Sequence, residues 1–361
     1  MGDYFNFYII YFFVAVMAIL DAFFLSLNKA RVVCFFLVLC LFVVIGFRGE
    51  FDSDYAAYSG IYDAVIFYDF DSFISSFRLN VEPLFVLTII FLKFFTFGPQ
   101  AIFIVCAFFS LSINWYYCLR WVPYPSLVIL GLLSHSFLYR EFTEIRHGVA
   151  GALCVASFFL LSSGRTRKAF VLQLIALLFH SASLFVISFS ILFCSTSRKN
   201  FILICTGLGA ILFFLGIHNL LEIANNLMSL PGSVTIYFQS EYDYNLGLLN
   251  PTFIKQSILI VFFFACSKYL KIKEERYLNF LCFYYVSVMW LFGANEFAMF
   301  AGRLASFFGV LEVYLFSMTL PYIRSKALKL SYIFLVIFVY AFQFYLNIEY
   351  KNIFLGDYIF F

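Results

Sequence analysis

Five ionisable residues lie at the edges of long apolar runs or inside them: Arg48, Asp54, Arg146, His180 and Arg303. Ionisable groups at membrane depth cost free energy, and they usually mark substrate or ion pathways. An arginine can grip a phosphate through two parallel hydrogen bonds, and an aspartate or a histidine can accept a proton from a hydroxyl group. The residue types therefore predict a site that binds a strongly anionic group and moves a proton.

Each of these positions also has a structural interpretation, which the sequence leaves open. An arginine can anchor a helix at the membrane interface or pair with a nearby glutamate, and a buried histidine can simply bond a carbonyl group. The structural alternatives are an interfacial anchor for Arg48, a residue that only solvates a loop for Asp54, a pair of Glu141 or Glu144 with Arg140 or Arg146, a carbonyl bond for His180, and a pair of Arg303 with Glu296.

The elements that must position these residues are transmembrane helices. The chain has 361 residues, of which 64% are apolar and 12% are charged, and its mean hydropathy is +0.96. Repeated apolar stretches of about 17–27 residues are typical of membrane-spanning helices, in which every backbone group is hydrogen-bonded within the segment. We therefore expect an all-α, polytopic integral membrane bundle, a single membrane domain over residues 1–361, with about ten to twelve transmembrane helices. The expected spans are 5–27, 31–47, 83–97, 100–119, 124–139, 147–163, 169–195, 201–217, 253–270, 277–294, 303–321 and 328–347.

Two longer polar connections, 48–82 and 218–252, are expected to be periplasmic loops of this domain. The first is rich in Asp and Glu, and the second contains no Lys or Arg. Cytoplasmic connections usually carry an excess of Lys and Arg. Those expected on the cytoplasmic side are 29–31, 165–168, 198–199, 268–276 and 324–329.

Simple alternation of spans conflicts with this assignment, because it places the basic connection 165–168 outside. One solution makes the short run 83–97 re-entrant and divides 169–195 into two half-helices that meet near His180. The other solution accepts one basic loop on the outside. The connection 218–252 has a length that is often found in lids and binding loops.

Several classes of site are missing from the sequence. The nine cysteines lie in apolar segments without metal-ligand spacing, and there is no phosphate-binding loop, nucleotide fingerprint or hydrolase motif. The Asp52-Ser-Asp54 spacing is weak evidence for a metal. We therefore expect no cofactor and no metal. We also expect no nucleic-acid partner, because the basic residues form no continuous stripe. No basic region or cleavage site marks a signal peptide, so the first helix is expected to be retained.

The motifs form an ordered set that resembles the Wzy-type O-antigen polymerases, in the branch that includes EpsG-like exopolysaccharide proteins. The resemblance covers residues 1 to about 325 and has departures: His147 stands where Gln is usual, Glu144 where Asn or Ser is common, and Asp52-Ser53 replaces Gly-Thr. The motifs that carry it are Phe47-Arg48, Asp54-Tyr55-Ala-Ala-Tyr58, Glu82-Pro83-Leu84-Phe85, Ile145-Arg146-His147-Gly-Val-Ala150, Phe179-His180-Ser-Ala-Ser183-Leu184 and Arg303-Leu-Ala-Ser-Phe307-Phe308.

The resemblance implies a metal-independent glycosyltransferase in the bacterial inner membrane, with its active site facing the periplasm. Such an enzyme transfers a growing glycan from undecaprenyl diphosphate to the non-reducing end of a new lipid-linked repeat unit. Similarity to the fold of integral-membrane C-type glycosyltransferases is expected by analogy only. A membrane protein that regulates chain length is the implied partner.

Within this interpretation the diphosphates would lie against Arg146 and Arg303. Arg48 would be a third clamp or would orient Asp54, and the general base would be Asp54 or His180. The glycan would contact aromatic residues beside the polar loop, namely Tyr55 and Tyr58. Direct attack by the acceptor hydroxyl would invert the anomeric centre.

Three other classes of protein fit the sequence less well. A flippase for lipid-linked oligosaccharides, or another polysaccharide transporter, would share the bundle and the arginines but would need no base. A membrane O-acyltransferase would use a buried histidine, although the expected Asn and His pair is not evident. A purely structural membrane protein would give no reason to retain several charges at membrane depth.

Overall fold

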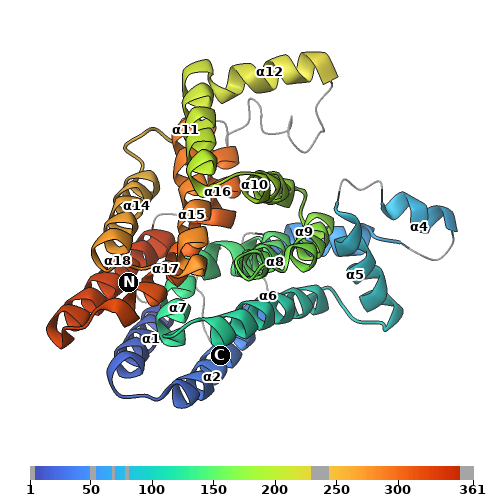
Figure 1. The fold of residues 1–361 in the computed structure, drawn as a ribbon. Coiled ribbons are helices and arrows are strands. Elements are labelled where there is room, and N and C mark those ends of the chain that lie inside the picture. The colour runs from blue at the N-terminus through green and yellow to red at the C-terminus, as the bar shows by residue number, and fades with distance from the viewer. Residues whose placement is uncertain (1–4, 49–53, 67–69, 78–80, 229–243, 350–361) are drawn as a thin grey trace. The chain divides into compact units, whose positions relative to one another are not determined.

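The computed structural model describes residues 5–48, 54–66, 70–77, 81–228 and 244–349. Every element in these ranges is a helix, as Figure 1 shows, and no strand occurs in them. The expected all-α class is therefore confirmed. Asp52 of the connection 48–82 and residues 229–243 of the connection 218–252 lie outside the described residues.

The described helices are those of a multi-pass membrane protein. Each expected span coincides with helical residues, although several spans consist of two shorter helices. The six helical segments long and apolar enough to cross a bilayer are Leu27–Gly46, Gln100–Tyr117, Arg198–Leu215, Pro251–Tyr269, Phe300–Tyr322 and Lys326–Glu349. The shorter apolar segments are Phe7–Phe23, Pro83–Phe94, Ile145–Leu161 and Ser181–Ser195.

Two of the expected spans have the lengths that a re-entrant arrangement requires. The helix from Pro83 to Phe94 has 12 residues, so it rises only about 18 Å, well short of a hydrocarbon core of about 30 Å. The run 169–195 is interrupted at His180, whose backbone is extended. The expectation of two helices that meet near His180 is thus confirmed.

The chain divides into two compact units, residues 1–181 with 316–361 and residues 182–315. Helix α17 (Leu311–Thr319) crosses this division. The other elements of the first unit are α1 (Phe5–Phe23), α2 (Leu27–Gly46), α3 (Tyr55–Ala64), α4 (Phe70–Ser76), α5 (Pro83–Phe94), α6 (Gln100–Trp121), α7 (Pro125–Leu132), η2 (Leu133–Thr143), α8 (Ile145–Leu161), α9 (Thr166–Phe179), η4 (Leu320–Tyr322) and α18 (Lys326–Glu349).

Helix α8 is the core of the first unit. All of its residues except Arg146 are buried, and it packs against α6, α9 and the π-helix η2. Its first turns are rich in small residues, which allow helices to approach closely in a membrane. A Cβ atom at Gly151 would lie 2.7 Å from the guanidinium carbon of Arg140 on η2. The small residues therefore make room for a buried arginine beside α8.

The acidic connection 48–82 contains structure of its own. Helix α3 packs beside α5, because the Tyr62 hydroxyl donates to the Phe97 carbonyl and the Lys93 ammonium donates to the Val65 carbonyl at 2.7 Å. Near their N-terminal ends, Tyr58 meets Phe85 edge to face at 5.9 Å. Part of the predicted loop is thus a helix, α3, that packs against α5.

The second unit is built around α15, which packs against α11, α14 and α16. Helices α11 and α15 approach closely at two glycines: a Cβ atom at Gly293 would lie 2.7 Å from the Gly209 carbonyl oxygen. The elements of this unit are η3 (Ser181–Ser183, which begins one residue before the division), α10 (Leu184–Ser195), α11 (Arg198–Leu215), α12 (Ile217–Met228), α14 (Pro251–Tyr269), α15 (Glu275–Gly293) and α16 (Ala298–Gly309).

The described parts of the connection 218–252 also contain structure. Its beginning lies in α12, and its end is bound to the turn between α15 and α16. The Leu246 N–H donates to the Asn295 carbonyl at 2.8 Å, and the Ala298 N–H donates to the Tyr244 carbonyl at 3.0 Å. This part of the connection therefore belongs to the second unit.

Candidate functional site

Glu82 lies at the centre of a polar cluster in the first unit. It immediately precedes α5, and Pro83 begins that helix. The Glu82 side chain accepts no hydrogen bond from the first turn of its own helix. Its carboxylate instead reaches the start of α8 and the break at the end of α9. Three elements separated in sequence therefore meet at one carboxylate.

Four donors surround this carboxylate. Oε2 accepts a hydrogen bond from Arg146 Nη1 in an ion pair. Oε1 lies 3.2 Å from His180 Nδ1, 3.0 Å from the Ser181 backbone nitrogen and 3.2 Å from the Ser181 hydroxyl. Charge-assisted hydrogen bonds of this kind are about twice as strong as neutral ones. The carboxylate thus holds a cation and an imidazole in fixed positions.

The same contacts determine the charge of Glu82. Burial alone would raise the pKa of the carboxyl, but the His180 hydrogen bond and the Arg146 charge outweigh it. The pKa falls from its ordinary 4.5 to about 2. Glu82 is therefore an anion at any physiological pH, and it can only accept hydrogen bonds.

This charge state assigns the proton on His180. Because the Glu82 carboxylate can only accept, the His180 Nδ1 atom that faces it must carry a hydrogen. In the neutral imidazole the other nitrogen, Nε2, then holds the lone pair. The pair has the chemistry of a general base whose tautomer is set by a carboxylate.

A second carboxylate–imidazole pair lies beside the first. His147 Nδ1 is 3.3 Å from Glu144 Oε2, and the His147 ring lies 5.1 Å from the His180 ring at an interplanar angle of 39°. His147 is almost completely buried, with 1% of its side chain exposed. The sequence did not distinguish His147 as a site residue, although it stands where the family usually has Gln.

Arg146 is held between Glu82 and two aromatic rings. Its guanidinium carbon lies 5.7 Å from the centre of the Tyr58 ring and 5.6 Å from that of Phe85. Arginine over an aromatic face gains about 0.5–2 kcal/mol. Arg146 is the second residue of α8, where exposed N–H groups favour an anion, so the predicted location at a helix start is confirmed.

Arg48 is buried against aromatic residues of α6 and η2. Only 1% of it is exposed, and its guanidinium carbon lies 4.5 Å from the Phe103 ring centre and 5.1 Å from that of Phe142. Arg48 is therefore enclosed by protein, with aromatic rings on two sides of its guanidinium group. Phe103 also contacts Tyr58, at 6.1 Å between ring centres. A line of aromatic rings thus connects the surroundings of Arg48 and Arg146.

The remaining predicted residues of this unit lie around α3. Asp54 is half-buried and immediately precedes the helix, where it makes no capping hydrogen bond with its side chain. Tyr55 stacks on Phe103 at 4.7 Å and lies 3.3 Å from Gln100 through its hydroxyl. Tyr58 is buried under Arg146. The rings of both tyrosines are therefore engaged in protein contacts.

Arg303 belongs to the second unit. It is the sixth residue of α16 and is half-buried. The cluster around Glu82 is formed entirely by the first unit, which contains Arg48, Asp54, Arg146 and His180. The structure thus brings Arg146 and His180 together through Glu82, and it describes Arg303 separately.

The segment before α8 contains a buried ion pair that is separate from the Glu82 cluster. It is one of the Arg–Glu pairs that the sequence offered as a structural alternative. Arg140 Nη2 lies 3.0 Å from Glu141 Oε1, and both side chains are almost fully buried. Both residues belong to η2, an 11-residue π-helix. Such helices are rare and frequently occur at functional sites. Of the four pairings considered from sequence, the structure selects this one.

The sequence analysis missed a second charged cluster, in the second unit. Lys255 on α14 lies 2.6 Å from Glu312 Oε1 on α17, and the Tyr284 hydroxyl of α15 donates to Glu312 Oε2 at 2.9 Å. Glu312 is completely buried. Both charges stand alone in apolar stretches, and that isolation was the available signal.

The sequence also did not identify Glu82 as a site residue. It appeared only as one acid of the connection 48–82 and as the first residue of Glu82-Pro83-Leu84-Phe85. The signal that could have found it is an acid placed directly before a proline that begins an apolar helix. No group of three or more His, Cys, Asp and Glu side chains in the described ranges is arranged to hold a metal ion.

A wide apolar groove lies next to this cluster. It has a volume of about 490 Å³. Helix α5, whose N-terminus is Glu82, contributes half of its lining. The lining residues are Phe42, Leu84, Leu87, Thr88, Phe91, Leu92, Ile104, Val105, Phe108 and Phe109.

Comparison with known proteins identifies one family. The EpsG family matches residues 31–360, which is nearly the whole chain. No curated protein and no solved structure matches the sequence.

Proposed function

Because the chain belongs to the EpsG family of membrane proteins, which is implicated in exopolysaccharide synthesis, we propose that it polymerises lipid-linked repeat units. The reaction transfers a glycan from undecaprenyl diphosphate to the non-reducing end of an acceptor repeat unit. One observation carries this proposal: Glu82 binds Arg146 through one carboxylate oxygen and His180 through the other. A cation for a leaving diphosphate and a base for an acceptor hydroxyl thus share one anchor.

His180 is the general base in this proposal. With Nδ1–H donated to Glu82, Nε2 accepts the proton of the acceptor hydroxyl as its oxygen attacks the anomeric carbon. The bond from that carbon to the diphosphate oxygen breaks, and the electron pair leaves with the diphosphate. A single displacement of this kind inverts the anomeric centre. Asp54 is the alternative base, and its half-buried position before α3 favours a role in positioning the acceptor.

The departing diphosphate develops negative charge, which fixed donors can stabilise without reorganisation. Arg146 supplies a planar fork of donors at the N-terminus of α8, and Ser181 adds a backbone N–H near the same carboxylate. Glu82 bonds Nη1 of Arg146, and a diphosphate would bind the other nitrogens, because a planar guanidinium offers donors to two partners at once. For Arg303, the assignment to a diphosphate rests on its sequence motif alone.

The apolar groove beside α5 suits the polyisoprenoid chain of the carrier lipid. Its lining contains nine apolar residues and one threonine, and it begins at Leu84, two residues after Glu82. A lipid chain in the groove would place its diphosphate end toward the N-terminus of α5. The enzyme would lie in the bacterial inner membrane with this end facing the periplasm, and a chain-length regulator would be its partner.

The test is the glycan profile of cells that lack the protein, complemented with variants. We expect wild-type protein to restore long polymers, and Glu82→Gln and His180→Ala to leave core plus one repeat unit. Glu222→Gln, which changes an exposed glutamate of α12, is the matched control and should restore full polymer. All variants should be compared at equal abundance in the membrane by immunoblot.

Two results would contradict the proposal. Full-length polymer in the Glu82→Gln cells would remove the anchor from the mechanism. Loss of the single-repeat product as well, in cells that lack the protein, would instead indicate a flippase or an earlier step of synthesis.

A further inference from the structure

A small cavity lies in the first unit, away from the Glu82 cluster. It is formed by α2, α6, α7 and η2, and its volume is about 30 Å³. A cavity needs roughly 10–15 Å³ by this measure to hold one water molecule. The lining residues are Val38, Leu41, Leu111, Asn114, Trp115, Ile129, Leu132, Leu133, Ser136, Phe137 and Glu141.

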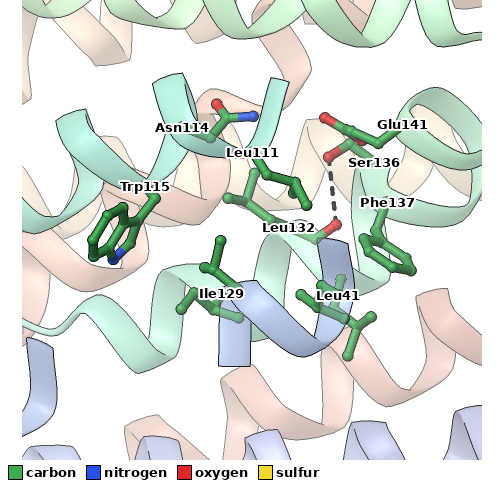
Figure 2. A pocket seen from close by; sticks show the side chains of 11 residues that line it. Leu41, Leu111, Asn114, Trp115, Ile129, Leu132, Ser136, Phe137 and Glu141 are labelled. Carbon is green, nitrogen blue, oxygen red and sulfur yellow. Dashed lines mark hydrogen bonds between the residues drawn. The ribbon is translucent and has the colours of Figure 1, made fainter. Parts of the chain in front are cut away.

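Two buried polar side chains on this cavity have an oxygen without a protein partner. Glu141 Oε2 and Asn114 Oδ1 make no hydrogen bond within the described residues, and each residue is only 4% exposed. A buried polar atom left in this state costs about 1–3 kcal/mol. Figure 2 shows Asn114 of α6 facing Glu141 and Ser136 of η2 at one end of the cavity, with apolar side chains at the other.

The π-helix explains why two polar groups of η2 come together. Ser136 and Glu141 are five residues apart, which is the spacing that the i to i+5 hydrogen bonds of a π-helix align. The Ser136 hydroxyl donates to the Leu132 carbonyl at 3.4 Å, as the dashed line in Figure 2 marks, and its oxygen can still accept. The cavity therefore has the Glu141 carboxylate, the Ser136 hydroxyl and the Asn114 amide on one side.

These groups select a neutral ligand. Arg140 donates to Glu141 Oε1 through Nη2 at 3.0 Å and through Nε at 3.3 Å, so the carboxylate charge is already balanced. A hard cation such as Ca²⁺ takes 6–8 oxygen ligands, which is more than the Glu141, Ser136 and Asn114 side chains supply. Water needs two to four polar partners, and it can donate to Glu141 Oε2 and bond the Asn114 amide.

We propose that this cavity is an internal water site, held by the Glu141 carboxylate and the Asn114 side chain. The water bridges α6 to η2 and completes the hydrogen bonding of the buried Arg140–Glu141 pair. This links a transmembrane helix to the segment that leads directly into α8. The inference stands on the cavity alone and is independent of the proposed function.

Radiolytic hydroxyl labelling of the full-length protein in lipid nanodiscs tests the site, because radicals formed from a bound water oxidise the side chains around it. Phe137 is the reporter, since it lines the cavity and is 3% exposed. Phe158 of α8 is the matched control, since it is 0% exposed and does not line the cavity. We expect at least fivefold more oxidation at Phe137, with delayed incorporation of ¹⁸O after transfer into H₂¹⁸O.

The Asn114→Leu variant tests whether the Asn114 side chain holds the water. Asn114→Leu has nearly the same shape without the amide, and labelling at Phe137 should fall to the level of Phe158. Equal labelling of the two phenylalanines in the wild-type protein would overturn the proposal, and that comparison needs no variant to fold. Undiminished labelling of Phe137 in Asn114→Leu would overturn the role of Asn114.

Discussion

At the scale of single residues, Glu82 decides how the candidate site is arranged. No sequence motif marked it as a site residue, yet its two carboxylate oxygens contact Arg146, His180 and Ser181. A buried carboxylate that is fully hydrogen-bonded orients its partners more strictly than an exposed ion pair, which contributes about 0–1 kcal/mol. The chemistry proposed for the arginine and the histidine therefore depends on a third residue.

The first prediction concerns the shape of the cation at position 146. Arg146→Lys should lose nearly as much activity as Arg146→Ala, by about 10²-fold or more, because a point charge cannot bind Glu82 and a diphosphate at the same time. Polymer length on a gel measures the effect. Arg167→Lys on the exposed start of α9 is the control and should retain activity. Wild-type polymer from Arg146→Lys would contradict the clamp.

The second prediction concerns pH. The folded-state pKa of Glu82 is lowered from 4.5 to about 2, so its contribution to stability is fully present above pH 4.5 and is lost as the pH falls toward 2. The thermal midpoint of the purified protein should therefore fall across that interval. The Glu82→Gln variant, which cannot titrate at this position, should show a smaller fall. Identical slopes for the two proteins would show that Glu82 is not stabilised as an anion.

At the scale of the elements, two features bring buried charges into an apolar bundle. In the first unit, small residues of α8 leave room for Arg140 from η2. In the second unit, three helices share the pair of Lys255 and Glu312 with the Tyr284 hydroxyl. Each charge lies beside its partner, because an isolated buried charge would cost several kcal/mol.

The third prediction concerns the close contact of Gly151. Its Cβ would lie 2.7 Å from the Arg140 guanidinium, so Gly151→Ala must displace a side chain that is held by Glu141. We expect a loss of about 1–3 kcal/mol in the free energy of unfolding. Gly207→Ala on α11, where a Cβ meets nothing within 4 Å, should be neutral or stabilising by up to about 1 kcal/mol. Equal unfolding midpoints for the two variants would refute the contact.

The fourth prediction concerns the buried pair of the second unit. Glu312→Gln leaves Lys255 without its counter-charge and should cost about 3–5 kcal/mol. In a double-mutant cycle, Lys255→Met combined with Glu312→Gln should cost less than the sum of the single changes. Chemical unfolding in detergent measures all three variants. Simple additivity would mean that the two side chains do not interact.

At the scale of the whole molecule, the membrane topology depends on whether α5 crosses the bilayer or returns to the side from which it enters. Helix α5 is too short to cross the bilayer, and α3 of the acidic connection packs along it. A re-entrant α5 keeps both of its ends on the side of that connection. Together with the division of 169–195 into two half-helices, this arrangement would remove the conflict between simple alternation and the basic connections.

The fifth prediction tests this arrangement. A cysteine at Gly98, after α5, should react from the periplasm with a membrane-impermeant maleimide, because Gly98 is exposed and a Cβ there meets nothing. Lys273→Cys, in a basic connection, should react only after the cells are opened. The background should carry Ala at the exposed Cys40 and Cys194. Protection of Gly98→Cys in intact cells would mean that α5 crosses the membrane.

Much of the element structure was predictable because it depends on local patterns. Apolar runs located the membrane helices, and the polar break at His180 located the division between α9 and α10. The motifs also led to the EpsG family, which the match over residues 31–360 confirms, whereas the resemblance to Wzy-type polymerases stays a prediction. These features follow from hydropathy and from residue types at fixed spacing, and neither depends on how distant segments meet.

The sequence by itself therefore determined the helical membrane class, the family and the candidate arginines and histidine. Only the tertiary structure decided which partners they have: Glu82 for Arg146 and His180, Glu141 for Arg140, and Glu312 for Lys255. The physical reason is that a buried ionisable group is stabilised by a counter-charge or a hydrogen-bond partner close to it. For Arg146, His180 and Lys255 that partner comes from a helix distant in sequence, which no local pattern specifies.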